Sequence, residues 1–212
     1  MSALPDRVPY SGRLVFEEDV HRYRLDGEVI PGITSVLKRA GMIEDGFYST
    51  EARDRGTAVH LAIQYLLEGC LAFETVDPSL LGYVEAFQRF VTESGIEFLE
   101  RPELLVGSET LRYATLVDGV GRIGRQVYVL NWKSGAAEPF HPVQAAGEAI
   151  AYVEAYGAAS IWTLGRAALY LGNDGRYSFH EHKRKGDLDD FRAAVRVAHW
   201  NEQHGQSARK EN

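Results

Sequence analysis

The stretch from Glu109 to Gly135 constrains the fold most, because it has the pattern of two strands joined by a tight turn. Residues 113–120 alternate in polarity, and residues 126–132 are rich in β-branched and aromatic side chains. The glycine-rich segment 121–124 between them favours a turn. Folding the chain back there is expected to bring Asp118 roughly opposite Asn131, within a residue or two.

The second of these strands divides its side chains between two faces of a sheet, since successive residues point in opposite directions. One face carries Val127, Val129, Asn131 and Lys133, and the other carries Tyr128, Leu130 and Trp132. An acid, an amide and a lysine therefore converge at the end of the hairpin. This layout suits hydrolysis of a phosphodiester with a divalent metal, and the alternative is an ordinary solvated hairpin end.

Size and charge narrow the class of protein. A chain of 212 residues with 45% hydrophobic residues is long enough for one well-packed domain, or one domain with a small appendage, and too short for two typical domains. The net charge of −7 argues against a protein that coats nucleic acid non-specifically. It does not exclude a nuclease whose basic side chains line one groove.

Cysteine usage and hydropathy indicate an intracellular protein. Cys70 stands alone, which excludes an internal disulfide framework and a cysteine-rich zinc site. No run of 18 or more apolar residues suggests a membrane span, and the first residues lack the apolar region of a signal peptide. We therefore expect a cytoplasmic protein with no membrane partner.

The order of the remaining elements predicts an α/β chain in which helices flank a central mixed sheet on both faces. Expected helices cover 49–69, 78–94, 143–156 and 187 onward, and expected strands cover 98–106, interrupted by Pro102, 166–172 and 177–183. Residues 1–45 are predicted to form a β-hairpin and short helix, either a lid or a protecting edge. The core then covers 46–204, and 205–212 form a polar tail.

His60 lies beside the apolar stripe of the first long helix, and Arg53 and Arg55 precede it by one to two turns. A single helix histidine can be a packing residue with satisfied hydrogen bonds, or its neutral imidazole can complete a divalent-metal site. Gly56 leaves room for close backbone approach on the same helix.

Four segments, taken in order, resemble the motifs of the PD-(D/E)XK nuclease superfamily. The likeness is greatest to its RecB-like exonucleases, the group of the mitochondrial genome maintenance exonuclease and related phage and bacterial nucleases. The segments are RGTAVH at 55–60, ETLRYATLVD at 109–118, VLNWKSG at 129–135 and PVQAAGEA at 142–149. The resemblance covers about residues 50–200 and implies a restriction-endonuclease-like core.

The resemblance also implies roles for single residues. Asp118, Asn131, Lys133 and Gln144 would be the catalytic set, and His60, Asp118, Asn131 and the carbonyl of Trp132 would hold Mg²⁺ or Mn²⁺. Arg53, Arg55, Lys183, Arg184 and Lys185 would contact DNA phosphates, although the last three also fit a solvated charge run. The implied activity is a DNA exonuclease of repair, recombination or phage DNA metabolism in a bacterial or phage-infected cell, with a recombinase or single-strand-binding protein as a candidate partner.

Two positions depart from the family pattern. Asn131 stands where the family has an acid, and Glu148 stands where a tyrosine often follows the glutamine. An asparagine keeps one oxygen for a metal but loses the negative charge, which would weaken binding of a divalent ion and could inactivate the enzyme. Asn131 is consistent with a deliberate Asp→Asn change or with natural divergence into a nucleic-acid-binding protein, and the intact Asp118 and Lys133 favour the former.

Overall fold

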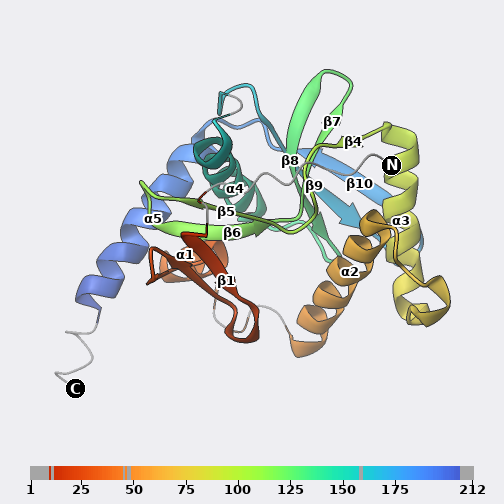
Figure 1. Ribbon diagram of the computed structural model, residues 1–212, viewed down its shortest axis with the longest axis horizontal. Coiled ribbons are helices and arrows are strands. Elements are labelled where there is room, and N and C mark those ends of the chain that lie inside the picture. The colour runs from red at the N-terminus through yellow and green to blue at the C-terminus, as the bar shows by residue number, and fades with distance from the viewer. Residues whose placement is uncertain (1–9, 11, 45, 47–48, 158–159, 206–212) are drawn as a thin grey trace.

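A five-stranded mixed sheet forms the centre of the computed structural model, which describes residues 10, 12–44, 46, 49–157 and 160–205 (Figure 1). Its strand order is β10-β9-β8-β7-β4. The strands are β4 Glu97–Phe98, β7 Gly119–Ile123, β8 Gln126–Lys133, β9 Gly165–Leu171 and β10 Tyr177–Glu181. Only β8 and β9 pair in parallel within this sheet, and the other neighbours are antiparallel.

The other strands of the described residues form two smaller sheets. The antiparallel N-terminal sheet contains β1 Leu14–Glu17, β2 Arg22–Leu25 and β3 Glu28–Ile30, and the second sheet pairs β5 Leu104–Ser108 with β6 Tyr113–Val117. Two short 3-10 helices are η1 Glu18–Val20 and η2 Phe73–Thr75. Asp26 and Gly27, both with positive φ, make the turn between β2 and β3 that the sequence predicts.

The five α-helices begin and end close to where the sequence predicts, because their caps are local signals. They are α1 Ile33–Arg39, α2 Thr50–Glu68, α3 Pro78–Ser94, α4 His141–Tyr156 and α5 Gly186–His204. The side chain of Ser49 accepts a hydrogen bond of 3.1 Å from the backbone nitrogen of Ala52 at the start of α2. Gly69 ends α2 in the left-handed conformation that glycine adopts without strain.

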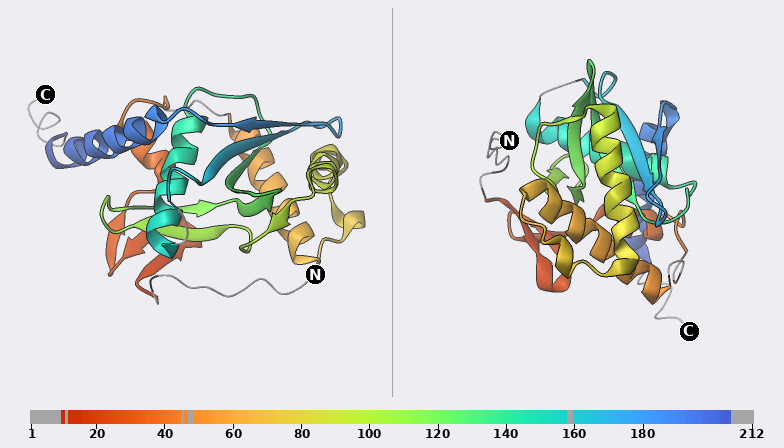
Figure 2. Two further views of the ribbon diagram at one scale, coloured as in Figure 1. Left: turned by 90° about the horizontal axis from the view of Figure 1, so that it is seen from above. Right: turned by 90° about the vertical axis from the view of Figure 1, so that its right-hand side faces the viewer.

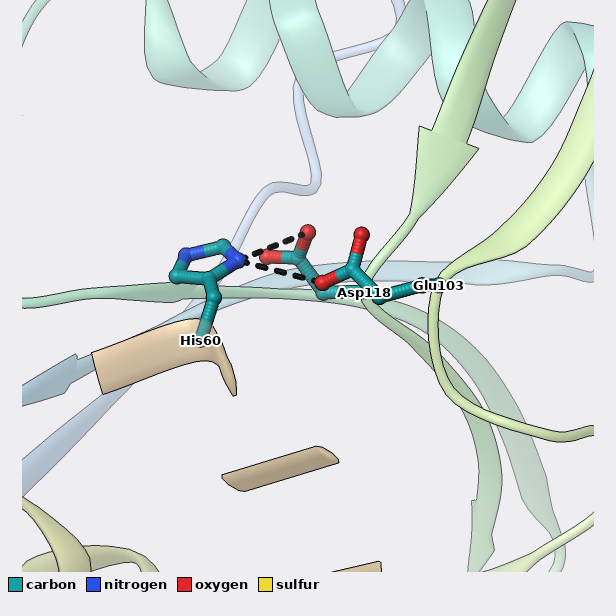
Figure 3. A group of neighbouring side chains, drawn as sticks. All are labelled: His60, Glu103 and Asp118. Atoms are coloured by element: carbon teal, nitrogen blue, oxygen red, sulfur yellow. Dashed lines mark hydrogen bonds and ion pairs between the residues drawn. The ribbon is translucent and has the colours of Figure 1, made fainter. Parts of the chain in front are cut away.

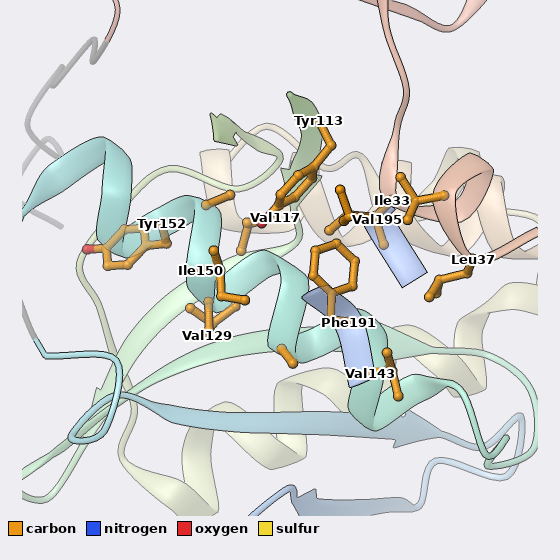
Figure 4. Close-up of a cluster of buried hydrophobic side chains, with 14 of the residues drawn as sticks. Ile33, Leu37, Tyr113, Val117, Val129, Val143, Ile150, Tyr152, Phe191 and Val195 are labelled. Carbon is orange, nitrogen blue, oxygen red and sulfur yellow. The ribbon is translucent and has the colours of Figure 1, made fainter. Parts of the chain in front are cut away.

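Helices cover both faces of the central sheet, as the sequence predicts (Figure 2). Alternation along β8 decides which side chains meet which helices. Val129 joins a core with residues of α1, α4 and α5 (Figure 4), whereas Leu130 and Trp132 join a second core with residues of α2 and α3. Helix α4 connects the parallel strands β8 and β9, which need such a crossover. The α/β prediction is therefore confirmed.

The region before the hairpin turn differs from the expectation of one strand over 113–120. It forms two strands in different sheets, since β6 pairs with β5 and β7 pairs with β8, and the chain changes sheets at Asp118. Gly119, directly after the change, lets the Trp132 ring pack against the backbone, because a Cβ there would lie 2.3 Å from that ring. The turn also comes later than predicted, after Ile123, which pairs with Gln126 across a left-handed Gly124.

The expected N-terminal unit, residues 1–45, contains two parts that pack differently. Helix α1 contributes Ile33, Val36 and Leu37 to the core beside α4 and α5. The β1–β3 sheet instead packs its own small core against Ala114 of β6. Residues 1–9 of this unit, and all of the expected tail except Gly205, lie outside the described residues. Within the described part of the chain, no helix combines the length and apolar character needed to span a membrane.

Candidate metal centre

Three segments distant in sequence meet where β8 ends. Helix α2 carries His60, the switch between β6 and β7 carries Asp118, and β8 carries Trp132 and Lys133 at its end. The pairing of Gly119 with Leu130 places Asp118 beside Asn131 just beyond the β7–β8 ladder. The sequence-based register is therefore confirmed to within the residue or two allowed for it.

Asp118 is held by the backbone of the neighbouring strand and is 6% exposed. Its Oδ2 accepts a 2.8 Å hydrogen bond from the backbone nitrogen of Trp132. Burial raises the pKa of this carboxyl to about 6, and the nearby Glu103 carboxylate adds to the rise while His60 and Lys133 oppose it. Asp118 is therefore ionised at neutral pH and becomes protonated in mild acid.

The imidazole of His60 lies between the Trp132 carbonyl and two carboxylates, and Figure 3 shows its contacts with the carboxylates of Glu103 and Asp118. Its Nε2 lies 3.0 Å from the Trp132 carbonyl oxygen, which can only accept, so Nε2 carries the hydrogen. Nδ1 then faces Glu103 Oε1 at 3.3 Å and Asp118 Oδ1 at 3.6 Å. Burial alone lowers the pKa of His60, but the charge of Asp118 and the contact with Glu103 outweigh it, so the pKa is raised.

Glu103 is a site residue that the sequence analysis did not identify. It lies between β4 and β5, and the ligand atoms of His60, Glu103 and Asp118 are all within 4.8 Å of one another. Its backbone has φ 52°, in the left-handed region, and its backbone nitrogen donates to the Asp118 carbonyl at 3.4 Å. The only available signal was an acidic residue directly after the Pro102 break, and such residues are common in loops.

A second polar network lies beside this cluster and includes Asn131. Lys133 Nζ donates to Gln144 Oε1 at 3.3 Å, and Gln144 Nε2 donates to Asn131 Oδ1 at 3.3 Å and to Glu148 Oε1 at 3.0 Å. Asn131 Nδ2 donates in turn to Glu148 Oε2. Gln144 thus positions Lys133, and both polar atoms of the Asn131 side chain take part in the network rather than in the cluster of His60.

Glu148, one turn after Gln144 on α4, is 1% exposed and lies at the centre of this network. Burial and, to a smaller extent, the charge of Asp118 raise its pKa to about 8 against the opposing effects of Lys133, Gln144 and Asn131. This carboxyl therefore holds a proton over much of the neutral range. An aspartate at position 131 would face it as a second carboxyl.

The basic residues predicted to contact phosphates fall into two groups. Arg53 is exposed and Arg55 half-buried, and both lie on α2 with His60; Arg55 Nε is buried without a hydrogen-bond partner among the described residues. Lys183 and Arg184 follow β10 and lie near the opposite end of β9 from Lys133. Glu181, the last residue of β10, pairs near the start of β9, whereas Lys133 pairs near the end of β9. Lys183 is ion-paired with Glu181, and Arg184 with two aspartates of α5.

No protein-family model matches the chain, and no curated protein is significantly similar to it. The side chains at the end of β8 and the four sequence motifs are therefore the observations that bear on function.

Proposed function

We propose that this protein is a divalent-metal-dependent nuclease that hydrolyses phosphodiester bonds in DNA. The observation that carries the proposal is the convergence of His60 and Asp118, 3.6 Å apart, with the backbone of Trp132 at the end of β8. Lys133 follows at the next position and is held by Gln144. A histidine, a carboxylate and an ammonium group from three separate segments thus lie near enough for the charge of Lys133 to act on both His60 and Asp118.

The donor set fits Mg²⁺ or Mn²⁺. Carboxylate oxygens are the ligands that both ions prefer, and an imidazole nitrogen suits Mn²⁺ better than Mg²⁺. His60 and Asp118 would hold the ion through Nδ1 and Oδ1, the two atoms that face each other. Because Asp118 has a pKa of about 6, its carboxylate is available to a cation at neutral pH.

The residues of the chain would act on the substrate in different ways. When bound, the ion would supply positive charge that polarises a phosphoryl oxygen and lowers the pKa of a nearby water. Lys133 uses one of its three N–H donors on Gln144 and keeps two for the charge that develops on the phosphate. Gln144 orients Lys133, and Arg53, two turns before His60 on α2, is placed to contact a neighbouring phosphate.

The finer parts of the proposal come from the motif resemblance. The order of RGTAVH, VLNWKSG and PVQAAGEA supports an exonuclease on a restriction-endonuclease-like core. On this basis we place the activity in DNA repair, recombination or phage DNA metabolism in the cytoplasm. A recombinase or a single-strand-binding protein is the corresponding candidate partner.

The side chain of Asn131 favours one alternative function, a non-catalytic nucleic-acid-binding protein. Asn131 has lost the negative charge of the family acid, and its amide is hydrogen-bonded to Gln144 and Glu148. On this alternative the protein binds DNA in a salt-dependent manner, and Asn131→Asp gains no cleavage.

Digestion of end-labelled DNA tests the proposal. Nucleotide release from single-stranded and duplex substrates is measured with Mn²⁺, with Mg²⁺ and with a chelator, for the wild type, Asn131→Asp and Asp118→Ala. We expect metal-dependent release by the wild type or by Asn131→Asp, and its loss in Asp118→Ala. The exposed Asp19→Ala is the matched control. No release by any form, together with unchanged metal and DNA binding in Asp118→Ala, would refute the enzyme proposal.

A further inference from the structure

Asn131 is uncharged where the motif has an acid, so another group would have to supply the second negative charge for a divalent metal ion. Asn131 is 2% exposed, and its Oδ1 and Nδ2 are hydrogen-bonded to Gln144 and Glu148. Among the sequence-predicted metal ligands, only Asp118 carries a negative charge. A single carboxylate with one imidazole is a poor set for a hard divalent cation, which needs oxygen ligands with charge.

Glu103 lies where such a charge is needed. Its Oε1 is 3.3 Å from His60 Nδ1, and its ligand atom lies within 4.8 Å of those of His60 and Asp118 (Figure 3). The Glu103 side chain is 23% exposed, so it borders the solvent from which an ion and a phosphate would enter. With Asp118 it restores a pair of carboxylates from two different loops.

The backbone holds Glu103 in this position. Its nitrogen donates to the carbonyl of Asp118, so the two acidic residues are tied together at the main chain. Glu103 also has φ 52°, a conformation that costs free energy for a residue with a Cβ. From this backbone position the Glu103 side chain reaches His60.

The orientation of His60 directs its second ring nitrogen at both carboxylates. Because Nε2–H is committed to the Trp132 carbonyl, Nδ1 faces Glu103 Oε1 at 3.3 Å, and a bound cation would displace the proton that Nδ1 shares with this carboxylate. Asp118 Oδ1 is 3.6 Å from that nitrogen, which is longer than a hydrogen bond, although the residue is more than nine-tenths buried. These three potential ligand atoms lie within 4.8 Å of one another, so positive charge between them is favoured, either as the proton of the metal-free protein or as a metal ion in its place.

We propose that Glu103 supplies the second carboxylate of the metal centre, in place of the acid that the motif assigns to position 131. This assignment rests on the proposed metal-dependent function. The ligand set is then His60 Nδ1 with one oxygen each from Glu103 and Asp118, and Asn131 belongs to the network that holds Lys133 through Gln144. The protein as it stands, with asparagine at 131, is competent to bind Mn²⁺.

Calorimetric titration with MnCl₂ tests the assignment, using the full chain after removal of metal by a chelator. We expect Glu103→Gln and Asp118→Asn each to weaken Mn²⁺ binding by about tenfold or more, since each removes a charged ligand. The exposed Glu74→Gln is the matched control and should bind as the wild type does. Loss in Asp118→Asn with full binding in Glu103→Gln overturns the role of Glu103 and leaves the nuclease proposal standing.

Thermal unfolding of the same variants separates a ligand from a structural residue. Without metal, Glu103→Gln should unfold close to the wild-type temperature, because the weakened contact with His60 is offset by the removal of repulsion between two carboxylates. It should lack the rise in unfolding temperature that Mn²⁺ gives the wild type. A wild type that binds no Mn²⁺ overturns both the assignment and the metal-dependent function. If Glu103→Gln does not fold, Glu103→Asp keeps the charge and shortens the side chain, and unchanged Mn²⁺ binding by that variant overturns the assignment.

Discussion

Nδ1 of His60 and Oδ1 of Asp118 lie 3.6 Å apart, although one residue is on helix α2 and the other between strands β6 and β7. The carbonyl of Trp132 fixes the imidazole, and the nitrogen of Trp132 fixes the carboxylate, so one residue of β8 orients both partners. This shared support means that small changes beside Trp132 should alter stability and the geometry of the site together.

Gly119→Ala is the first such change. A Cβ at this position would lie 2.3 Å from the Trp132 ring, a rigid group buried in the core between β8 and α3. We expect a loss of about 1–3 kcal/mol in the free energy of unfolding, the usual result of overpacking. Urea denaturation measures it. Gly135→Ala is the control, because its Cβ would meet no described atom within 4 Å and should cost far less.

The buried Glu148 predicts a specific pH dependence in the metal-free protein. Its pKa is raised from 4.5 to about 8 in the folded state, so the folded protein keeps a proton that the unfolded chain releases. The free energy of unfolding should therefore fall as pH rises from about 4.5 to 8. Glu148→Gln, which mimics the protonated acid, should remove this decline and be more stable than the wild type by more than about 1 kcal/mol at pH 8.

Urea denaturation at a series of pH values, with a chelator present, checks this difference. The comparison with Glu148→Gln isolates the carboxyl from Asp118 and His60, which also titrate in the folded protein. Parallel stability curves for the wild type and Glu148→Gln between pH 5 and 8 would show that Glu148 is ionised throughout. Glu74→Gln on the surface should follow the wild-type curve.

Lys133 should contribute to turnover and not to metal binding. Lys133→Gln removes the ammonium group that we assign to the developing phosphate charge, so we expect the cleavage rate to fall about a hundredfold or more. The Mn²⁺ affinity of the variant should stay within a few-fold of that of the parent protein, since Lys133 is not one of the proposed metal ligands. The parent protein is the wild type or Asn131→Asp, whichever cleaves DNA, and the cleavage rates of the parent and of its Lys133→Gln variant are compared. Lys38→Gln, at an exposed position of α1, is the control, and an equal loss there would contradict the role.

The two groups of basic residues lead to different expectations for DNA binding. Arg53 shares α2 with His60, whereas Lys183 is ion-paired with Glu181 near the start of β9. Arg53→Gln should weaken DNA binding and reduce the slope of log affinity against log salt by about one. Lys183→Gln should have a smaller effect. Fluorescence anisotropy at several salt concentrations measures both, and a larger effect at Lys183 would place the DNA elsewhere.

The elements that the sequence predicted well depend on local chemistry. Ser49 and Gly69 bound α2 because a hydroxyl can cap a helix and glycine tolerates the left-handed conformation. The alternation from Val127 to Lys133 separated the two cores of the sheet correctly, since the period of a strand fixes its faces. The motifs that suggested His60 and Lys133 lie on these regular elements, and Asp118 lies between two strands.

The parts that the sequence did not predict depend on long-range packing. The change of sheet at Asp118 follows from the pairing of β6 with β5, which leaves no local mark in residues 113–120. Glu103 lies in a loop, and its approach to His60 depends on a left-handed backbone at a non-glycine residue. The burial of Glu148 against Asn131 likewise depends on how α4 packs across β8.

Binding of Mn²⁺ to the wild type, to Asp118→Asn and to His60→Gln tests the central claim most directly. The claim is that these two side chains form a divalent-metal site at the end of β8, and calorimetry at pH 7.5, well above the pKa of about 6 of Asp118, measures it. We predict that the wild type binds one ion per chain and that each variant binds at least about tenfold more weakly. A wild type that binds no Mn²⁺, or equal binding by all three proteins, would contradict the account.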